Sequence, residues 1–328
     1  MRPIKHILLA VKDASTAPTA AALNKAIQLA SAFGTSLELF HSITTRVYMG
    51  FDLGRKELEA LKDAHLRQQR ALLEALAERA REAGVRTSVS VEWDYPPHEA
   101  VMRQAIKCKA DFIVAECHRG HRIAPLLLHV TDWELLRYSP VPVLLVKNRR
   151  PYARPVILAA VDPTHANAKP TRLDEEILAA AAAMEDAFKG ELHVVHSFVP
   201  VPADVQPSEL IAADSTHRLE TRARAHARTR LQNALGKVQV AHSRRHLLSA
   251  HPVNAIPLLA RKIHSDIVVM GAISRTGLKR LLIGNTAERV IDELPCDVLV
   301  VKPQEFVTRV HREGRGMRIS TPPLPMPY

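Results

Sequence analysis

The sequence predicts two tandem α/β domains, each a doubly wound layer around a five-stranded, mostly parallel sheet. Three observations lead to this prediction. The chain has 328 residues, which is room for two domains at roughly 150 residues each. Residues 111–147 align without a gap with residues 266–302, at an offset of 155, so the chain contains a duplication. Within each copy, short apolar runs alternate with longer helical patterns, as in strand–helix–strand units.

The duplication also sets the expected domain limits. Leu126-Leu127 meets Leu281-Leu282, Pro140 meets Pro295, and the front strands match as well. We expect a first domain at 1–148, a linker at 149–155 and a second domain at 156–303. The remaining residues, 304–328, form a basic, Pro-rich tail. Since the tail shows no periodicity, we expect it to be disordered, and its removal to change melting by only a few degrees.

The strands of the first copy are expected at Ile4–Val11, Ser36–His41, Thr87–Trp93, Phe112–Cys117 and Val143–Lys147. Its helices are expected at Thr16–Phe33, Lys56–Ala83, His98–Lys107 and Thr131–Arg137. Several of these strands are continuous apolar runs without alternation. Such runs are typical of strands buried on both faces, between layers of helices.

The second copy repeats this order. Its strands are expected at Val156–Val161, Glu191–Phe198, Val238–Leu247, Ile267–Gly271 and Val298–Lys302. Its helices are expected at Leu173–Phe188, Ser215–Leu235, Asn254–Lys262 and Thr286–Glu293. Parallel sheets of this kind bind ligands outside the carboxyl ends of the strands, at the switch point of the strand order.

Composition narrows the function. Hydrophobic residues make up 47% and charged residues 24%, so the whole chain is not disordered. The net charge of +11 favours acidic or phosphorylated partners, but the low aromatic content of 4% makes nucleic acid an unlikely partner. Three cysteines without CxxC spacing argue against a disulfide framework and against a zinc site. No apolar stretch is long enough for a membrane span, and we expect a cytoplasmic protein.

The segment from Gly271 to Thr286 is the most informative loop. It runs from a buried strand end to a helix start, where backbone N–H groups and the helix dipole favour an anion. The same residues fit turn chemistry alone, because Asn285 and Glu288 have the spacing of a capping box. Both interpretations stay open at this point.

The pattern from Gly271 through Gly284-Asn285-Thr286-Ala287-Glu288-Arg289 to the strand Val298–Lys302 resembles the signature of the universal stress protein family. The duplication resembles the tandem-domain E type, as does the segment 131–137. The resemblance covers Met1 to Pro303. It implies a flavodoxin-like fold and an internal pseudo-dimer in which Val143–Val146 and Val298–Val301 pair across a dyad; a homodimer of chains is possible too.

The resemblance also implies a ligand site in the second copy. In nucleotide-binding members an acidic residue after the first strand approaches the adenosine, and loop glycines hold the phosphates. Serine replaces the middle glycine here, and asparagine follows the last one. The implied site for ATP, with Mg²⁺ undefined, consists of Asp162, Gly271, Ser274, Arg275, Gly284, Asn285 and Thr286. No catalytic residue and no metal ligand is expected.

The first copy has lost this pattern. Lys12 stands where the second copy has Asp162. The loop positions are Glu116, Arg119, His129 and Val130, without a glycine among them. We therefore expect the first copy to bind no nucleotide.

We expect a non-enzymatic stress-response protein that holds a ligand in its second copy. Two alternatives remain, a weak ATPase or ATP-switched regulator and a carrier of an apolar or amphiphilic ligand. The histidines are expected to be structural. His41 and His196 recur at the same place in both copies, which indicates a shared packing or hydrogen-bonding role near the strand end.

Overall fold

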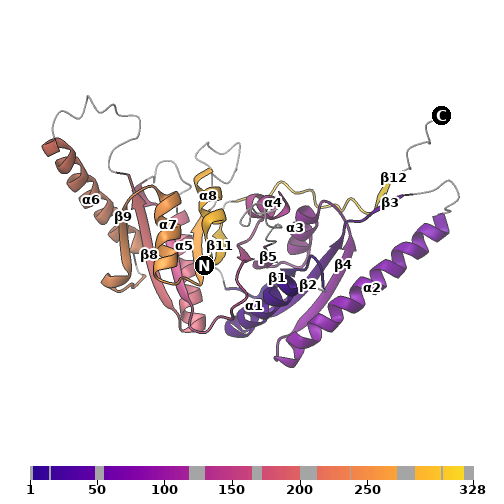
Figure 1. The fold of residues 1–328 in the computed structure, drawn as a ribbon. Helices are drawn as coiled ribbons and strands as arrows, with labels where there is room; N and C mark the ends of the chain where they lie inside the picture. The colour runs from indigo at the N-terminus through magenta and orange to yellow at the C-terminus, as the bar shows by residue number, and fades with distance from the viewer. Residues whose placement is uncertain are drawn as a thin grey trace, which may run out of the picture. The chain divides into compact units, whose positions relative to one another are not determined.

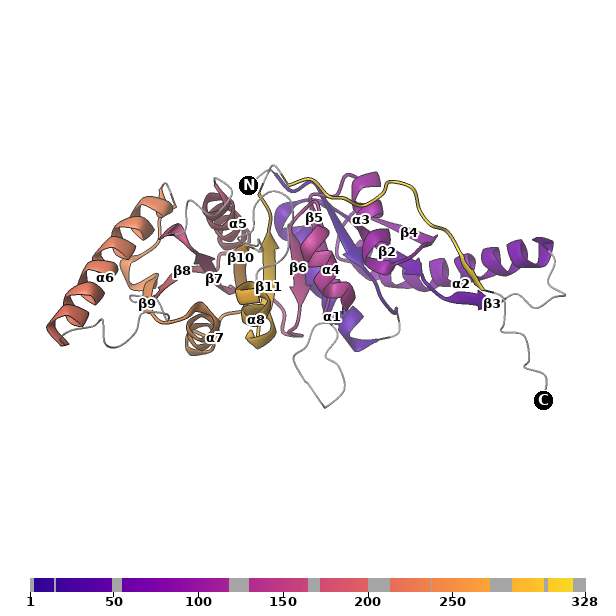
Figure 2. The ribbon, with the colours of Figure 1, turned by 90° about the horizontal axis from the view of Figure 1, so that it is seen from above.

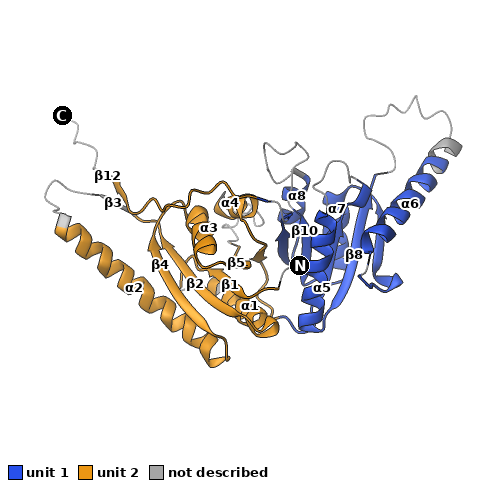
Figure 3. Cartoon of the chain, turned by 180° about the vertical axis from the view of Figure 1, so that it is seen from behind, with its two compact units in different colours: residues 1, 119–127, 152–306 blue, residues 2–118, 128–151, 307–328 orange. Residues whose placement is uncertain are grey.

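The computed structural model describes residues 3–14, 16–48, 55–117, 130–164, 172–199, 213–236, 238–271, 285–303 and 306–320. The chain divides into two compact units (Figure 3). The C-terminal unit is built from residues 152–306. The N-terminal unit is built from residues 2–118, 128–151 and 307–328.

The N-terminal unit contains a sheet of five parallel strands in the order β4-β2-β1-β5-β6. The strands are β1 (His6–Ala10), β2 (Ser36–Ile43), β4 (Thr87–Trp93), β5 (Phe112–Glu116) and β6 (Val143–Val146). The helices are α1 (Ala17–Phe33), α2 (Arg55–Glu82), α3 (Pro97–Lys107) and α4 (Val130–Tyr138). Helices α1 and α2 lie on one face of the sheet, and α3 and α4 on the other (Figure 1).

The C-terminal unit repeats the arrangement with the strand order β11-β10-β7-β8-β9, again all parallel. Its strands are β7 (Val156–Val161), β8 (Glu191–Phe198), β9 (Arg245–Ser249), β10 (Ile267–Gly271) and β11 (Asp297–Val301). Its helices are α5 (Leu173–Phe188), α6 (Ala213–Leu235), α7 (Pro252–Lys262) and α8 (Asn285–Glu293). The view from above shows α5 and α7 on opposite sides of this sheet (Figure 2).

The apolar strands form the two cores. Ile7, Leu8 and Leu9 of β1 are fully buried, and so are Ile267 and Val268 of β10. Burial on both faces explains why these strands show no polar alternation. The predicted fold class, two doubly wound and parallel α/β layers, is confirmed.

Local signals set the ends of helix α1. Its N-cap is Thr16, whose hydroxyl accepts a hydrogen bond from the Thr19 N–H. Its C-cap is Gly34, which has a left-handed backbone with φ of 64°. The helix therefore begins and ends where a hydroxyl and a glycine satisfy its free backbone groups. Within the part of the chain described, no helix has the length and apolar character to cross a membrane.

Strand β9 differs from its prediction. The strand was expected at Val238–Leu247, but the ladder with β8 begins only at Arg245. Residues His242–Arg244 form a short 3₁₀ turn instead, and the Arg245 side chain donates to the Val240 carbonyl. The guanidinium thus satisfies a backbone acceptor that a longer strand would have used in the sheet.

The C-terminal segment corrects a second expectation. Residues 306–320 do not form a free tail, because residues 318–320 form strand β12 (Arg318–Ser320), which pairs in parallel with β3 (Arg46–Tyr48) of the N-terminal unit. The segment before β12 contacts the end of β4 and the start of α3. These contacts are polar and irregular, so no hydrophobic periodicity in the sequence predicts them.

Candidate functional site

The candidate site lies at the switch point of the C-terminal sheet. Strands β7 and β10 are parallel neighbours, with Met270 opposite Ala160. Asp162 directly follows β7, and Gly271 is the last residue of β10. The strand order therefore brings the first two predicted site residues to the same edge of the sheet, where open α/β sheets bind ligands.

Asp162 is held in place but keeps a partly exposed carboxylate. Its backbone N–H donates to Asp174 Oδ1 at 3.0 Å, and its own Oδ1 accepts a hydrogen bond from Thr164 Oγ1 at 3.2 Å. The side chain is 36% exposed. Asp174 belongs to the first turn of α5, so this helix fixes the end of β7. The arrangement leaves an oriented hydrogen-bond acceptor at the sheet edge.

Packing favours glycine at position 271. A Cβ atom at this position would lie 2.6 Å from Cδ2 of Leu173 and 3.3 Å from Cδ1 of Ile177. Both leucine and isoleucine are buried residues of α5. The glycine thus allows α5 to approach the end of β10, which is a structural reason for it independent of any ligand.

The rest of the predicted site is only partly described. Ser274, Arg275 and Gly284 lie outside the described residues. Asn285 and Thr286 are the first residues of α8, so the helix begins one residue before the predicted start. The structure therefore joins Asp162 and Gly271 at one edge and places a helix N-terminus at the end of the loop that leaves β10.

The N-terminal unit closes the equivalent position with an ion pair. Lys12 follows β1 as Asp162 follows β7, and its ammonium lies 2.5 Å from Asp132 Oδ1. The Asp132 side chain is 1% exposed and belongs to the first turn of α4, where the helix dipole favours a carboxylate. At the offset of 155, the second copy has Ala287 at this position. The lysine and the aspartate are thus a matched pair that the second copy lacks.

The end of the fourth strand of each unit, β5 or β10, also differs between the two copies. Glu116, which stands in place of Gly271, is buried and accepts a hydrogen bond from Thr19 Oγ1 at 2.7 Å. The offset of 155 also relates α1 to α5, so Thr19 and Ala22 stand where α5 has Asp174 and Ile177. A large residue at the strand end thus faces small residues on the helix, and the reverse holds in the C-terminal unit.

The shared histidines have the predicted structural role. His41 Nδ1 donates to the Val11 carbonyl at 2.9 Å, and His196 Nδ1 donates to the Val161 carbonyl at 3.3 Å. Each side chain ties the second strand of its unit to the end of the first. They position the residues Lys12 and Asp162 that follow.

A separate polar cluster lies at the opposite edge of the N-terminal sheet, near the start of β1 and β2. His6, Glu38 and Cys108 bring their potential ligand atoms within 4.8 Å of one another. Glu38 also accepts a hydrogen bond from Gln104, and His6 and Gln104 together keep its carboxyl pKa low against the effect of burial. Burial and the Glu38 charge raise the Cys108 thiol pKa to about 12. These contacts indicate that the cluster is a largely buried carboxylate, Glu38, with hydrogen-bonding neighbours around it.

The matches to known proteins agree with the fold. A model of the universal stress protein family matches residues 3–147 and 156–302. The chain belongs to the universal stress protein family. Universal stress protein E of Salmonella typhi is 31% identical over 296 residues, which are 88% of this chain and 92% of the relative. Its counterpart in Escherichia coli K12 is 30% identical over 298 residues, with the same coverage.

Solved structures show the same fold over both domains of this universal stress protein. A protein of Pseudomonas aeruginosa PAO1 matches with a TM-score of 0.69 and 25% identity, over 92% of this chain and 94% of its own. A universal stress protein of Archaeoglobus fulgidus matches with a TM-score of 0.62 and 17% identity, over 90% and 98%. The resemblance seen in the sequence, including the tandem E type, is thus confirmed.

Sequence reasoning missed three residues of this universal stress protein's candidate site. In the first copy, Asp132 forms an ion pair with Lys12, and Thr19 donates a hydrogen bond to Glu116. In the second copy, Asp174 accepts a hydrogen bond from the Asp162 N–H. One signal was present for all three. Each of them changes type between the two copies at the offset of 155, as the loop positions such as Glu116 and Gly271 do.

Proposed function

We propose that this universal stress protein is a non-enzymatic stress-response factor whose C-terminal unit holds one adenine nucleotide, such as ATP. The N-terminal unit holds none. A single observation carries the proposal: the matching position beyond the first strand is a partly exposed carboxylate in one unit, Asp162, and a lysine already paired with a buried aspartate in the other.

The C-terminal edge has the chemistry that a nucleoside phosphate needs. A carboxylate accepts hydrogen bonds from ribose hydroxyls or from an amino group. The N-terminus of α8 follows the loop from β10, and free N–H groups with the helix dipole behind them stabilise phosphate charge. Asn285 replaces a hydroxyl residue but keeps its backbone N–H, so the family's phosphate-binding mode is altered and not lost.

The N-terminal edge has the opposite properties. The ammonium of Lys12 is neutralised by Asp132 and is not free to attract an anion. The carboxylate of Glu116 is buried at the end of β5, where a phosphate would meet a second negative charge. Nucleotide binding there requires breaking one ion pair and exposing one buried acid.

Two solved structures that match a single domain are a universal stress protein in complex with cAMP and one from Archaeoglobus fulgidus in complex with dAMP. They are 20% and 16% identical to this chain, which indicates the fold alone. The proposal rests on the residues of this chain, and the identity of the nucleotide is decided by experiment.

Native mass spectrometry of the full chain with ATP tests the proposal. We expect one nucleotide per chain, an affinity lowered at least about tenfold by Asp162→Asn, and no binding by Gly284→Val. Lys12→Met is the matched control at the equivalent position and should bind as the wild type does. Equal binding by wild type and Asp162→Asn, or none by either, contradicts the proposal.

Two further readouts of the same sample decide between the alternatives. Release of ADP above a buffer blank, lost in Gly284→Val, replaces the non-enzymatic role with that of a weak ATPase or an ATP-switched regulator. An amphiphilic molecule that travels with the purified protein in place of a nucleotide replaces it with that of a carrier.

A further inference from the structure

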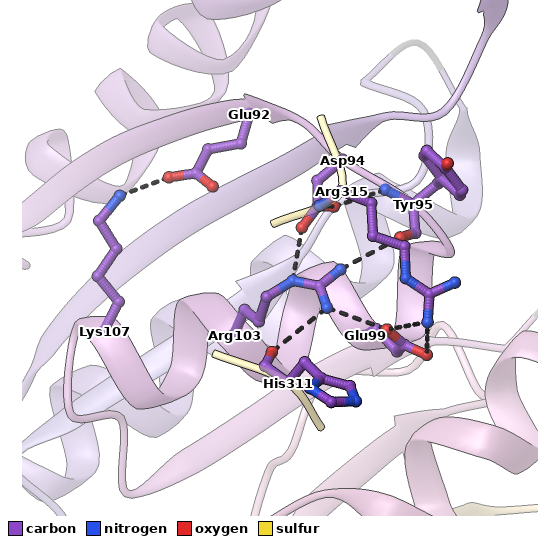
Figure 4. Close-up of polar contacts among 8 residues, drawn as sticks. All are labelled: Glu92, Asp94, Tyr95, Glu99, Arg103, Lys107, His311 and Arg315. Carbon is purple, nitrogen blue, oxygen red and sulfur yellow. Dashed lines mark hydrogen bonds and ion pairs between the residues drawn. The ribbon is translucent and has the colours of Figure 1, made fainter. Parts of the chain in front are cut away.

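The C-terminal segment is bound by a defined set of groups in the N-terminal unit (Figure 4). The backbone N–H of Arg315 donates to Asp94 Oδ1 at 2.8 Å. The Arg315 guanidinium donates to both oxygens of Glu99, at 2.9 and 3.0 Å. Asp94 follows β4 and Glu99 lies in the first turn of α3, so the segment binds at the carboxyl edge of the sheet.

The glycines on either side of Arg315 suit this contact. A Cβ atom at Gly314 would lie 3.3 Å from Asp94 Oδ2, which is tighter than most side-chain contacts. Gly316 has a φ of 69°, in the left-handed region that favours glycine. Both positions therefore favour glycine beside the bound arginine.

The contact extends to both sides of this triplet. The Tyr95 ring lies under two guanidinium groups, with Arg315 at 5.9 Å and Arg318 at 5.2 Å from its centroid. Cations at these distances are attracted by an aromatic face. Arg103 Nη1 donates to the His311 carbonyl at 3.5 Å, and β12 adds backbone pairing with β3.

The binding groups are held in place by the N-terminal unit itself. Arg103 Nε donates to Asp94 Oδ2 at 2.7 Å, and Arg103 Nη1 donates to Glu99 Oε2 at 3.0 Å. The Tyr95 N–H donates to Asp94 Oδ1 at 2.8 Å. Both carboxylates thus have partners that fix their orientation without the segment. A site of this kind is preorganised, so little ordering opposes binding.

The duplication supplies an internal comparison. At the offset of 155, the C-terminal unit has Ser249, Asn254 and Leu258 in place of Asp94, Glu99 and Arg103. Arg103 is 7% exposed, whereas Leu258 is 62% exposed. The C-terminal unit thus lacks this charged set at the matching positions, and its sheet forms without it.

We propose that the N-terminal unit carries a peptide-binding site for an arginine flanked by glycines, and that residues 311–318 are its tethered ligand. The unit that has lost the nucleotide pattern has gained a site for a cationic segment at the same edge of its sheet. Because the tether keeps the ligand at a high effective concentration, a site of modest intrinsic affinity is filled within the chain. The same site binds the same sequence when it is supplied on a separate molecule.

The test uses full-length variants and a fluorescent synthetic peptide of residues 307–320. Arg315→Ala should release the chain's own segment and open the site. We expect this variant to bind the peptide at least about tenfold more tightly than the wild type does. Arg312→Ala is the matched control, since this exposed arginine lies six residues before β12 and makes none of the contacts above. It should behave as the wild type.

Two further measurements make the outcome decisive. A peptide carrying Arg315→Ala, or a protein carrying Glu99→Gln together with Arg315→Ala, should lose binding. In the wild type, excess peptide should speed hydrogen exchange of the amides of residues 313–318 by displacing them. Failure of the peptide to bind folded Arg315→Ala protein, with no effect on exchange in the wild type, overturns the proposal. Equal binding to wild type and Arg315→Ala overturns it as well.

Discussion

At the scale of single residues, the residue at a strand end and the helix residue that faces it change together between the two copies. Gly271 faces Leu173 and Ile177, while Glu116 faces Thr19. Each strand end is therefore matched to the helix packed on it. A glycine that the family resemblance assigns to a ligand has a packing role in this chain as well, and the two roles predict different consequences of substitution.

The packing role of Gly271 predicts a coupled stability effect. Gly271→Ala should lower the free energy of unfolding by about 1–3 kcal/mol, because the new methyl group overlaps Leu173. Gly271→Ala combined with Leu173→Ala should lose less stability than the sum of the two single losses, which urea unfolding would measure as a non-additive cycle. Additive losses would show that the two residues are not in contact.

The ion pair of Lys12 predicts a second cycle. Lys12→Met leaves the buried Asp132 carboxylate without its partner and should cost about 1–3 kcal/mol. The double variant Lys12→Met/Asp132→Ala removes both charges and recreates the alanine of the second copy, so it should unfold at a higher urea concentration than Lys12→Met alone. A double variant less stable than the single one would contradict this account.

At the scale of elements, β9 is the edge strand of its unit and is held through polar side chains. The rings of His193 on β8 and His246 on β9 are stacked, and their Nδ1 and Nε2 atoms are 2.9 Å apart. Burial lowers the pKa of both histidines. Arg244 lowers that of His193 further despite the opposing effect of Glu191, and His193 and Lys262 lower that of His246.

These pKa directions predict a loss of stability on acidification. A histidine whose pKa is lowered by folding takes up its proton more readily in the unfolded state. Its contribution is therefore complete above the ordinary pKa of 6.5 and is lost as the pH falls below it. The free energy of unfolding should fall between pH 7 and pH 5.5, and fall less in His246→Gln.

The control for this experiment is internal. Burial also lowers the pKa of His98, in the other unit. His98 therefore lowers the free energy of unfolding on acidification equally in the wild type and in His246→Gln. The difference between wild type and His246→Gln therefore isolates the stacked pair. Identical pH profiles would show that the pair does not titrate with folding.

The elements differ in how well the sequence predicts them. Buried strands such as β1 and β10 were predicted closely, because continuous apolar runs have few alternatives in an α/β chain. Strand β9 was misplaced because arginine and histidine residues carry it, and their hydrogen bonds are not visible as a period. The three-residue strands β3 and β12 were missed because about 270 residues separate them in the sequence.

At the scale of the whole molecule, the sequence predicted the duplication and the asymmetry of its two copies, but not the docked C-terminal segment. The receptor groups Asp94, Glu99 and Arg103 are spread over a strand end and a helix, and their ligand follows more than 200 residues later. Only the folded unit brings them together. The pseudo-dimer implied by the family resemblance stays a prediction.

The docked segment gives truncation a defined structural cost, although the expected change in melting stays within a few degrees. A chain ending at Pro303 loses the charged hydrogen bonds of Arg315 to Asp94 and Glu99. We expect its melting temperature to fall by about 3–6 °C, measured by calorimetry, because roughly 1–2 kcal/mol is lost from a unit of this size. The full chain with Arg312→Ala should melt as the wild type does. A truncated chain that melts with the wild type would mean that docking contributes no stability.

The central claim is that one copy kept a ligand position and the other closed it. Isothermal titration of the full chain with ATP tests this claim most directly, through the number of sites. The account predicts one nucleotide per chain, with binding weakened by Asp162→Asn and unchanged in number by Lys12→Met. Two equivalent sites per chain, or one site that survives Asp162→Asn and disappears in Lys12→Met, would contradict it.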